Sequence, residues 1–182
     1  MKAGTRALGL AESYAGDASR STLAGAVVRA DRIVDDFCFR SFTVGGSDVT
    51  DAAIDVWESL ERPDVQYVLV AGVALAWYNI LELHRLHEAT DRPVLSVSFE
   101  ASAGLEAAIR REFSGDARDA RLAAYRALPE RRPVSVGDDT VYVRSVGCEN
   151  PDSVVRTYTP EGGRPEPLRV AREAARAADD YR

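Results

Sequence analysis

Three short apolar runs fill the first 44 residues and have the length and composition of β-strands. Only Asp31-Arg32 separates the second run from the third, which predicts a hairpin between them. Gly45-Gly46 then breaks the chain. We therefore expect three consecutive strands, at residues 7–14, 22–30 and 33–44.

From residue 48 onward, strand patterns alternate with helical ones. Either Asp48 or Thr50 can cap a helix that Pro63 ends. The apolar residues of this helix fall on one face: Ala53, Ile54, Trp57 and Leu60. Further strands are expected at 65–73, 93–99 and 140–146, with a loop between Pro129 and Pro133. Further helices are expected at 78–89, at 103–113, at 116–127, after Asn150-Pro151, and after Gly162-Gly163, where the polar end at about 176–182 should fray.

This order of elements predicts the fold class. A three-strand antiparallel meander that feeds parallel strands through helices gives a mixed sheet with helices on both faces. That order is typical of the three-layer α/β ribonuclease H-like fold, and flavodoxin-like and other three-layer folds share parts of it. Because no linker stands out, we expect residues 1–182 to form one domain.

Composition narrows the class of protein. No run approaches the roughly 20 apolar residues of a membrane span, and the N-terminus lacks a signal-peptide core, so we expect a cytoplasmic protein. Of 23 basic residues only Lys2 is lysine, and the net charge is −6, which together favour a halophilic archaeal source. This charge argues against a strongly basic, nonspecific nucleic-acid binder, but it is compatible with a local arginine-lined groove.

The strand at 65–73 ends where an open α/β sheet usually places its ligands. Ala71-Gly72 lies at that point, and the phenol of Tyr78 is the single ionisable group between Val68 and Asn79. This strand therefore supplies no acidic or basic side chain to the expected site.

Four segments carry a resemblance to a known family. GRPEPLRVA, from Gly163 to Ala171, resembles the R-x-P-E-P-x-R-x-A segment of endonuclease V-like proteins. ALGLAESY (7–14) resembles a first strand that usually reads G-I-D-D-G, and TVGGSDVTDA (43–52) resembles V-D-G-x-D-A-T. Residues 67–100 resemble a strand, an L-D-G-I turn, a helix and a strand. Over roughly residues 1–175, the chain resembles the archaeal domain of unknown function 99, which is associated with endonuclease dU.

The resemblance implies a fold, a reaction and a cofactor. The fold would be ribonuclease H-like, and the reaction would be cleavage of DNA beside a deaminated base of the deoxyuridine type. Carboxylates at the ends of adjacent strands would hold Mg²⁺ or Mn²⁺, because a hard cation takes oxygen ligands and stabilises the attacking and leaving oxygens. The damaged nucleotide would leave the base stack to be recognised.

The sequence departs from this pattern at three positions. Ala11, Gly45 and Ala71 stand where the family has acidic residues. Glu12 adjoins Ala11, but in a regular strand its side chain points to the opposite face. A second hypothesis is therefore a catalytically silent relative that binds nucleic acid or a nucleotide and needs no metal.

Eight residues are candidates for the site. Glu12 and Asp48 are the candidate catalytic residues and metal ligands, although each can instead cap a strand end or a helix. Candidates for contact with DNA are Ser13, Tyr14, Thr50, Trp77, Arg164 and Arg169. Arg169 can instead pair with Glu166, and Trp77 can instead pack under a helix. The arginines between positions 110 and 132 alternate with acids, so they form either a phosphate track or a salt-bridged surface.

Overall fold

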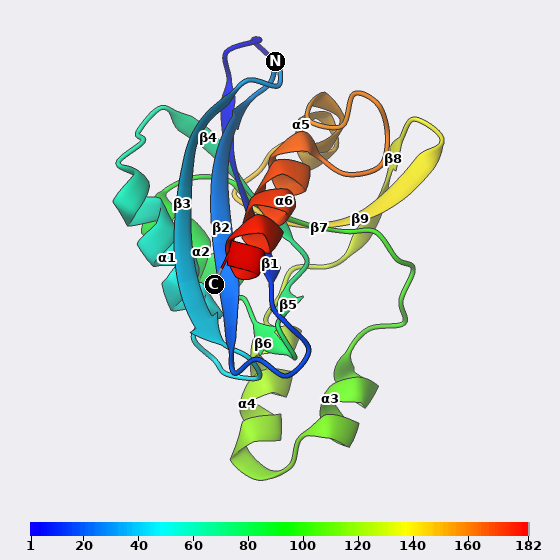
Figure 1. Ribbon diagram of the computed structural model, residues 1–182. Coiled ribbons are helices and arrows are strands. Elements are labelled where there is room, and N and C mark those ends of the chain that lie inside the picture. Colours follow the sequence, from blue (N-terminus) through cyan, green and yellow to red (C-terminus); the bar gives the residue numbers. More distant parts are fainter. Residues whose placement is uncertain (182) are drawn as a thin grey trace.

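A seven-stranded mixed sheet runs through the computed structural model, which describes residues 1–181 (Figure 1). Its strands lie in the order β3-β2-β1-β4-β7-β9-β8. They are β1 (Arg6–Ser13), β2 (Arg20–Arg29), β3 (Val34–Thr43), β4 (Val65–Ala71), β7 (Val94–Ser98), β8 (Arg132–Val136) and β9 (Asp139–Val146). The first three are antiparallel, and β4 is parallel to both β1 and β7. This arrangement confirms the predicted hairpin and the ribonuclease H-like fold class.

Helices cover both faces of the sheet. On one face, α1 (Val49–Leu60) and α2 (Leu83–Thr90) pack against Leu8, Leu10 and Val68. On the other face lie α5 (Pro151–Thr157) and α6 (Glu166–Tyr181), and α6 is helical to its last described residue. The helices α3 (Glu106–Glu112) and α4 (Gly115–Arg126) form a lobe beyond one end of the sheet (Figure 1). Within the described residues, no helix combines the length and apolar character needed to cross a membrane.

Two predictions of secondary structure are wrong. The expected helix at 78–89 begins only at Leu83, because the preceding residues form a small hairpin of β5 (Ala74–Leu75) and β6 (Asn79–Ile80). The apolar residues near Ile80 are buried, and this made the segment look like one helix face. The expected loop at Pro133 belongs to β8, which pairs with β9 alone. An edge strand tolerates proline because its outer N–H groups need no partner.

The P-E-P segment brings α6 unusually close to β1. A Cβ atom at Gly9 would overlap the backbone of Pro167, so only glycine fits at this position. The helix then follows β1 along the sheet and buries Leu168, Ala171 and Ala175. This close packing carries the residues around α6 to the end of the sheet where β1 and β4 finish.

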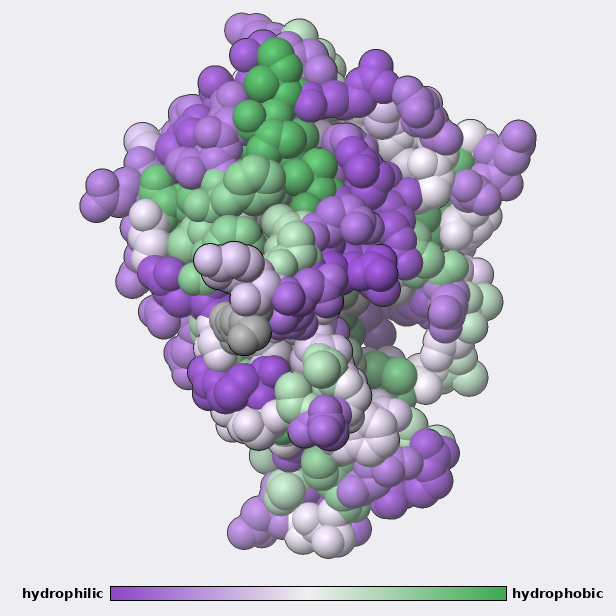
Figure 2. Space-filling model, in the orientation of Figure 1, coloured by the Kyte–Doolittle hydropathy of each residue, from purple (hydrophilic) through white to green (hydrophobic). Residues whose placement is uncertain are grey.

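The edge strand β3 is partly apolar, and side chains form hydrogen bonds with some of its backbone groups. Figure 2 shows a hydrophobic strip beside the charged surface of α6. The exposed large hydrophobic residues in and next to β3 are Ile33, Val34, Phe37 and Phe39. The Asp36 side chain accepts from the Phe37 N–H, and Arg40 donates to the Phe39 carbonyl oxygen. Side chains that satisfy edge groups in this way hinder pairing with another strand.

A candidate site at the ends of the parallel strands

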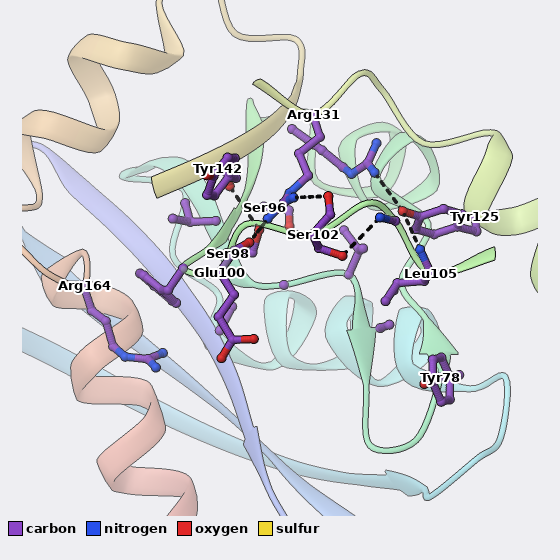
Figure 3. A pocket seen from close by; sticks show the side chains of 18 of the residues that line it. Tyr78, Ser96, Ser98, Glu100, Ser102, Leu105, Tyr125, Arg131, Tyr142 and Arg164 are labelled. Carbon is purple, nitrogen blue, oxygen red and sulfur yellow. Dashed lines mark hydrogen bonds between the residues drawn. The ribbon is translucent and has the colours of Figure 1, made fainter. Parts of the chain in front are cut away.

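A cavity of about 600 Å³ opens where β4 and β7 end (Figure 3). Ala71 and Gly72 form part of its floor, together with residues of β7. Four segments contribute to its walls: the β5–β6 hairpin, β9, the α3–α4 lobe and the region of α6. Its position agrees with the expectation that ligands of open α/β sheets lie beyond the carboxyl ends of the strands.

Four arginines line this cavity: Arg131, Arg144, Arg164 and Arg172. Arg131 donates to the Ser98 hydroxyl at 3.1 Å and lies 4.1 Å above the ring of Tyr142. Arg144 donates to the Tyr125 hydroxyl at 3.3 Å and to the carbonyl oxygen of Pro129. Among residues 1–181, none of the four takes part in an ion pair, so their positive charges are not neutralised by carboxylates in contact. The single acidic residue that lines the cavity is Glu100.

Arg164 and Arg172 differ from the other two because their donors are uncommitted. Neither guanidinium makes a hydrogen bond within the part of the chain that the structure describes, and Arg164 lies 4.1 Å above the Phe99 ring. Burial lowers the pKa of Arg164, the charge of Arg172 lowers it further, and Glu100 acts in the opposite direction. Both cations line the cavity, and their charges oppose each other there (Figure 3 shows Arg164).

A tight turn between β5 and β6 presents aromatic side chains to the cavity. Ala76, Trp77 and Tyr78 have φ angles of 36°, 63° and 56°, an uncommon conformation for residues other than glycine. Trp77 is 50% exposed and its ring meets that of Tyr78 edge-on at 5.6 Å. Three successive left-handed residues persist only where the surroundings hold them. This turn is therefore a built feature of the site.

The two predicted metal ligands both hold this turn. Glu12 accepts from the Ala76 N–H at 3.4 Å and from the Ser21 hydroxyl at 2.9 Å. Asp48 accepts from the side-chain amide of Asn79 at 2.9 Å. The turn is anchored further by the Gly45 N–H, which donates to the Ala76 carbonyl oxygen at 2.8 Å. Each acid thus bonds to a different end of the turn, and neither lines the cavity.

The alanines at the expected acid positions lie together. Ala11 is 1% exposed and packs with Ala26, Val28 and Ala171, and Ala71 packs against the same cluster. Side chains alternate along β1, so Ala11 and Glu12 point to opposite faces of the sheet. Ala11 packs against Ala171 of α6, whereas Glu12 reaches the β5–β6 turn. Where the family resemblance implies carboxylates, the sheet therefore presents methyl groups beneath α6.

These donors do not fit the metal that the resemblance implies. Mg²⁺ and Mn²⁺ need several convergent oxygen ligands, whereas Ala11, Gly45 and Ala71 offer no side-chain oxygen. The oxygens of Glu12 and Asp48 already accept hydrogen bonds. Nowhere in the described chain do three or more His, Cys, Asp or Glu residues form a group that could hold a metal ion.

The remaining candidates are divided between the cavity and the scaffold. Trp77 and Arg164 line the cavity, whereas Ser13, Tyr14, Thr50 and Arg169 do not. Ser13 uses its carbonyl to accept from Ser21. Thr50 is buried and accepts from the Glu82 N–H, which fixes the chain after β6. Arg169 makes a bidentate ion pair with Glu166 at 2.6 and 2.8 Å, the alternative considered for this residue.

Several cavity residues were missed because their signals are weak in the sequence. Arg144 and Tyr142 alternate with the buried Val141 and Val143, so a polar strand face was visible, but nothing indicated that it borders the site. Arg172 is one of many arginines in the last helix. The arginines between 110 and 132 play different parts: Arg126 pairs with Glu106 on the surface, whereas Arg131 enters the cavity.

Asp48 should stabilise the fold in a pH-dependent way. Burial alone would raise the pKa of its carboxyl, but hydrogen bonds from Thr43 and Asn79 hold this pKa below its ordinary value. Its contribution is therefore complete above the unfolded pKa of about 3.9 and is lost as the pH falls through the lower folded pKa. Because the carboxyl is partly exposed, we expect Asp48→Asn to cost about 1 kcal/mol at pH 7 and less at pH 3, measured by urea unfolding. The exposed Asp51→Asn is the control, and an Asp48→Asn cost that does not shrink in acid would contradict this role.

The fold places the chain in a known structural class. It superposes on the crystal structure of a protein of unknown function from Archaeoglobus fulgidus with a TM-score of 0.83 and 21% identity, covering 96% of this chain and 98% of that one. It also superposes on Ciona intestinalis endonuclease V, solved with a 24mer DNA that contains an inosine, with a TM-score of 0.60 and 12% identity. That match covers 97% of this chain and 86% of the enzyme. The class is thus the endonuclease V-like, ribonuclease H-like fold.

The sequence identifies the family within that class. The family model described as endonuclease dU matches residues 3–179. A UPF0215 protein from Pyrobaculum calidifontis is 31% identical over 178 residues, which cover 96% of this chain and 97% of that protein. The chain belongs to the endonuclease dU family, and the resemblance found in its motifs is confirmed.

Proposed function

We propose that this protein binds nucleic acid in the cavity at the ends of β4 and β7, and that it does so without the metal-dependent cleavage that the family resemblance implies. The observation that carries this proposal is the set of four cavity arginines, whose charges contact no carboxylate among the described residues. Phosphate groups are the common polyanionic partners of such unpaired arginines.

Aromatic rings at the same cavity support the proposal. Trp77 and Tyr78 stand at the rim, and the half-exposed indole of Trp77 is free to stack on an unpaired base. Arginines for the backbone and aromatic rings for the bases are the two elements of single-strand recognition. DNA bound to the Ciona endonuclease V adds support from a protein of the same fold.

Cleavage of deoxyuridine-type or other deaminated DNA is the alternative function. Family membership favours it, whereas the scarcity of metal ligands argues against it. Glu12 and Asp48 bond to different ends of the β5–β6 turn, and among the described residues no group of three His, Cys, Asp or Glu residues is placed to hold Mg²⁺ or Mn²⁺. We therefore favour binding over cleavage.

Tryptophan emission offers a direct test of binding. The chain contains two tryptophans, and Trp57 packs in α1, so a Trp57→Phe protein reports on Trp77 alone. A single-stranded oligonucleotide should quench this emission, and Trp77→Ala should weaken binding in fluorescence anisotropy by roughly tenfold, as loss of one stacked base predicts. Phe37→Ala, which removes an exposed aromatic ring outside the cavity, should leave the affinity unchanged. Binding that ignores Trp77 would exclude the cavity as the binding site.

A further inference from the structure

We infer that Arg164 and Arg172 form a subsite for a terminal phosphate, so that the cavity holds the phosphorylated end of a strand or a mononucleotide. This inference rests on the proposed function and specifies the part of the nucleic acid that the site recognises.

The guanidinium groups of Arg164 and Arg172 have free N–H donors within the described part of the chain. By contrast, Arg131 donates to the Ser98 hydroxyl, and Arg144 donates to the Tyr125 hydroxyl and to a backbone carbonyl. These bonds hold the cavity wall. Arg164 and Arg172 make no such bonds among residues 1–181. A guanidinium carries five N–H donors in a plane that matches two phosphate oxygens. This pair can therefore bind an anion without breaking any contact of the wall.

The charge of the pair selects the kind of phosphate. Arg164 and Arg172 line the same cavity, and the charge of Arg172 lowers the pKa of Arg164, so a bound anion would relieve the repulsion between the two cations. A phosphodiester brings one negative charge and two unesterified oxygens. A phosphomonoester brings nearly two charges and three oxygens at pH 7, which matches two guanidinium groups. Glu100 lines the same cavity and reduces the positive potential that a bound anion meets.

The size of the cavity limits how much of a strand it can hold. Its walls come from the β5–β6 hairpin, β9, the α3–α4 lobe and the α6 region, and its volume of about 600 Å³ suits a ligand of about one nucleotide. The ring of Phe99 backs the Arg164 guanidinium at 4.1 Å and fixes its plane. A terminal nucleotide could place its phosphate on the arginines and its base toward Trp77 or Tyr78, which line the same cavity.

The experiment compares one oligonucleotide sequence with a 5′-phosphate, with a 3′-phosphate and with neither, by anisotropy at fixed salt. We expect one phosphorylated form to bind at least tenfold more tightly than the unphosphorylated strand. Arg172→Gln should remove most of this difference, and Arg164→Gln should do the same. Arg176→Gln, on the next turn of α6 and 59% exposed, is the matched control and should preserve the difference. Unlabelled mononucleotide and inorganic phosphate, added as competitors, show whether the phosphate alone or the attached nucleotide is recognised.

The possible outcomes separate this inference from the proposed function. Equal affinity for all three strands would overturn the terminal-phosphate subsite and leave nucleic-acid binding intact. A preference that persists in both arginine variants would also overturn it. If no strand binds in any form, both proposals fail. Displacement by mononucleotide but not by inorganic phosphate supports recognition of a nucleotide end.

Discussion

Ala11→Asp is expected to lower the free energy of unfolding by about 3–5 kcal/mol at pH 7, the usual cost of an uncompensated buried charge. Position 11 is 1% exposed, and its neighbours are Ala26, Val28 and Ala171. Burial should raise the pKa of the new carboxyl. The part of the penalty that comes from ionisation is therefore present above that raised pKa and declines as the pH falls toward the unfolded value of about 3.9. Urea unfolding between pH 4 and 8 measures both effects.

The same variant tests whether position 11 belongs to a metal site. Ala15→Asp, in the exposed loop after β1, is the control and should change stability by less than about 0.5 kcal/mol. Mg²⁺ or Mn²⁺ should not restore the stability of Ala11→Asp, because Ala71 and Gly45 provide no further ligands. Rescue of Ala11→Asp by either ion, with no effect on Ala15→Asp, would show that the sheet end can assemble a metal site.

Arg121→Ala should lower the free energy of unfolding by about 3 kcal/mol, because hydrogen bonds to charged groups contribute about 1.5–3 kcal/mol each and do not add fully. The Arg121 guanidinium donates to the carbonyl oxygens of Gly45, Gly46 and Tyr78 and lies 4.0 Å above the Phe113 ring. It therefore joins the α3–α4 lobe to the loop after β3 and to the strained turn. Chemical denaturation gives the loss, and hydrogen exchange should rise first in α3 and α4.

Arg118→Ala is the matched control for this prediction. Arg118 lies one turn earlier on α4 and pairs with Asp119 on the surface, an arrangement worth about 0–1 kcal/mol. Equal stability losses for the two variants would mean that Arg121 does not anchor the lobe.

Much of the fold could be read from the sequence because burial and periodicity agree along most of it. The apolar runs of β1 to β3 end close to the observed strand boundaries. Asp48 and Asn150 occupy the N-cap positions of α1 and α5, although only the Asn150 side chain makes a cap hydrogen bond. The β5–β6 turn could not be predicted, because its left-handed residues are Ala76, Trp77 and Tyr78, which carry no local signal for that conformation. Tertiary hydrogen bonds impose it instead: Glu12 accepts from the Ala76 N–H, and the side chains of Asn79 and Arg121 donate to the carbonyl oxygens of Thr43 and Tyr78.

The position of the site could be predicted from the sequence, but only some of the residues that line it could be. The run that ends at Ala71-Gly72 indicated the correct edge of the sheet, and the P-E-P segment indicated Arg164. Glu12 at a strand end and Asp48 in the segment that resembles the family motif both suggest metal binding, but their hydrogen-bond partners become visible only in three dimensions. Arg144 and Arg172 come from elements distant in sequence, and only the packing of β9 and α6 brings them to one cavity.

The most direct test measures binding and strand integrity together. Uracil- or hypoxanthine-containing single strands are incubated with the protein in EDTA, in Mg²⁺ or in Mn²⁺, and followed by anisotropy and by gel. We predict intact strands in all three conditions, with affinities that agree within about threefold once ionic strength is matched. Metal-dependent cleavage that Glu12→Gln abolishes would contradict binding without cleavage.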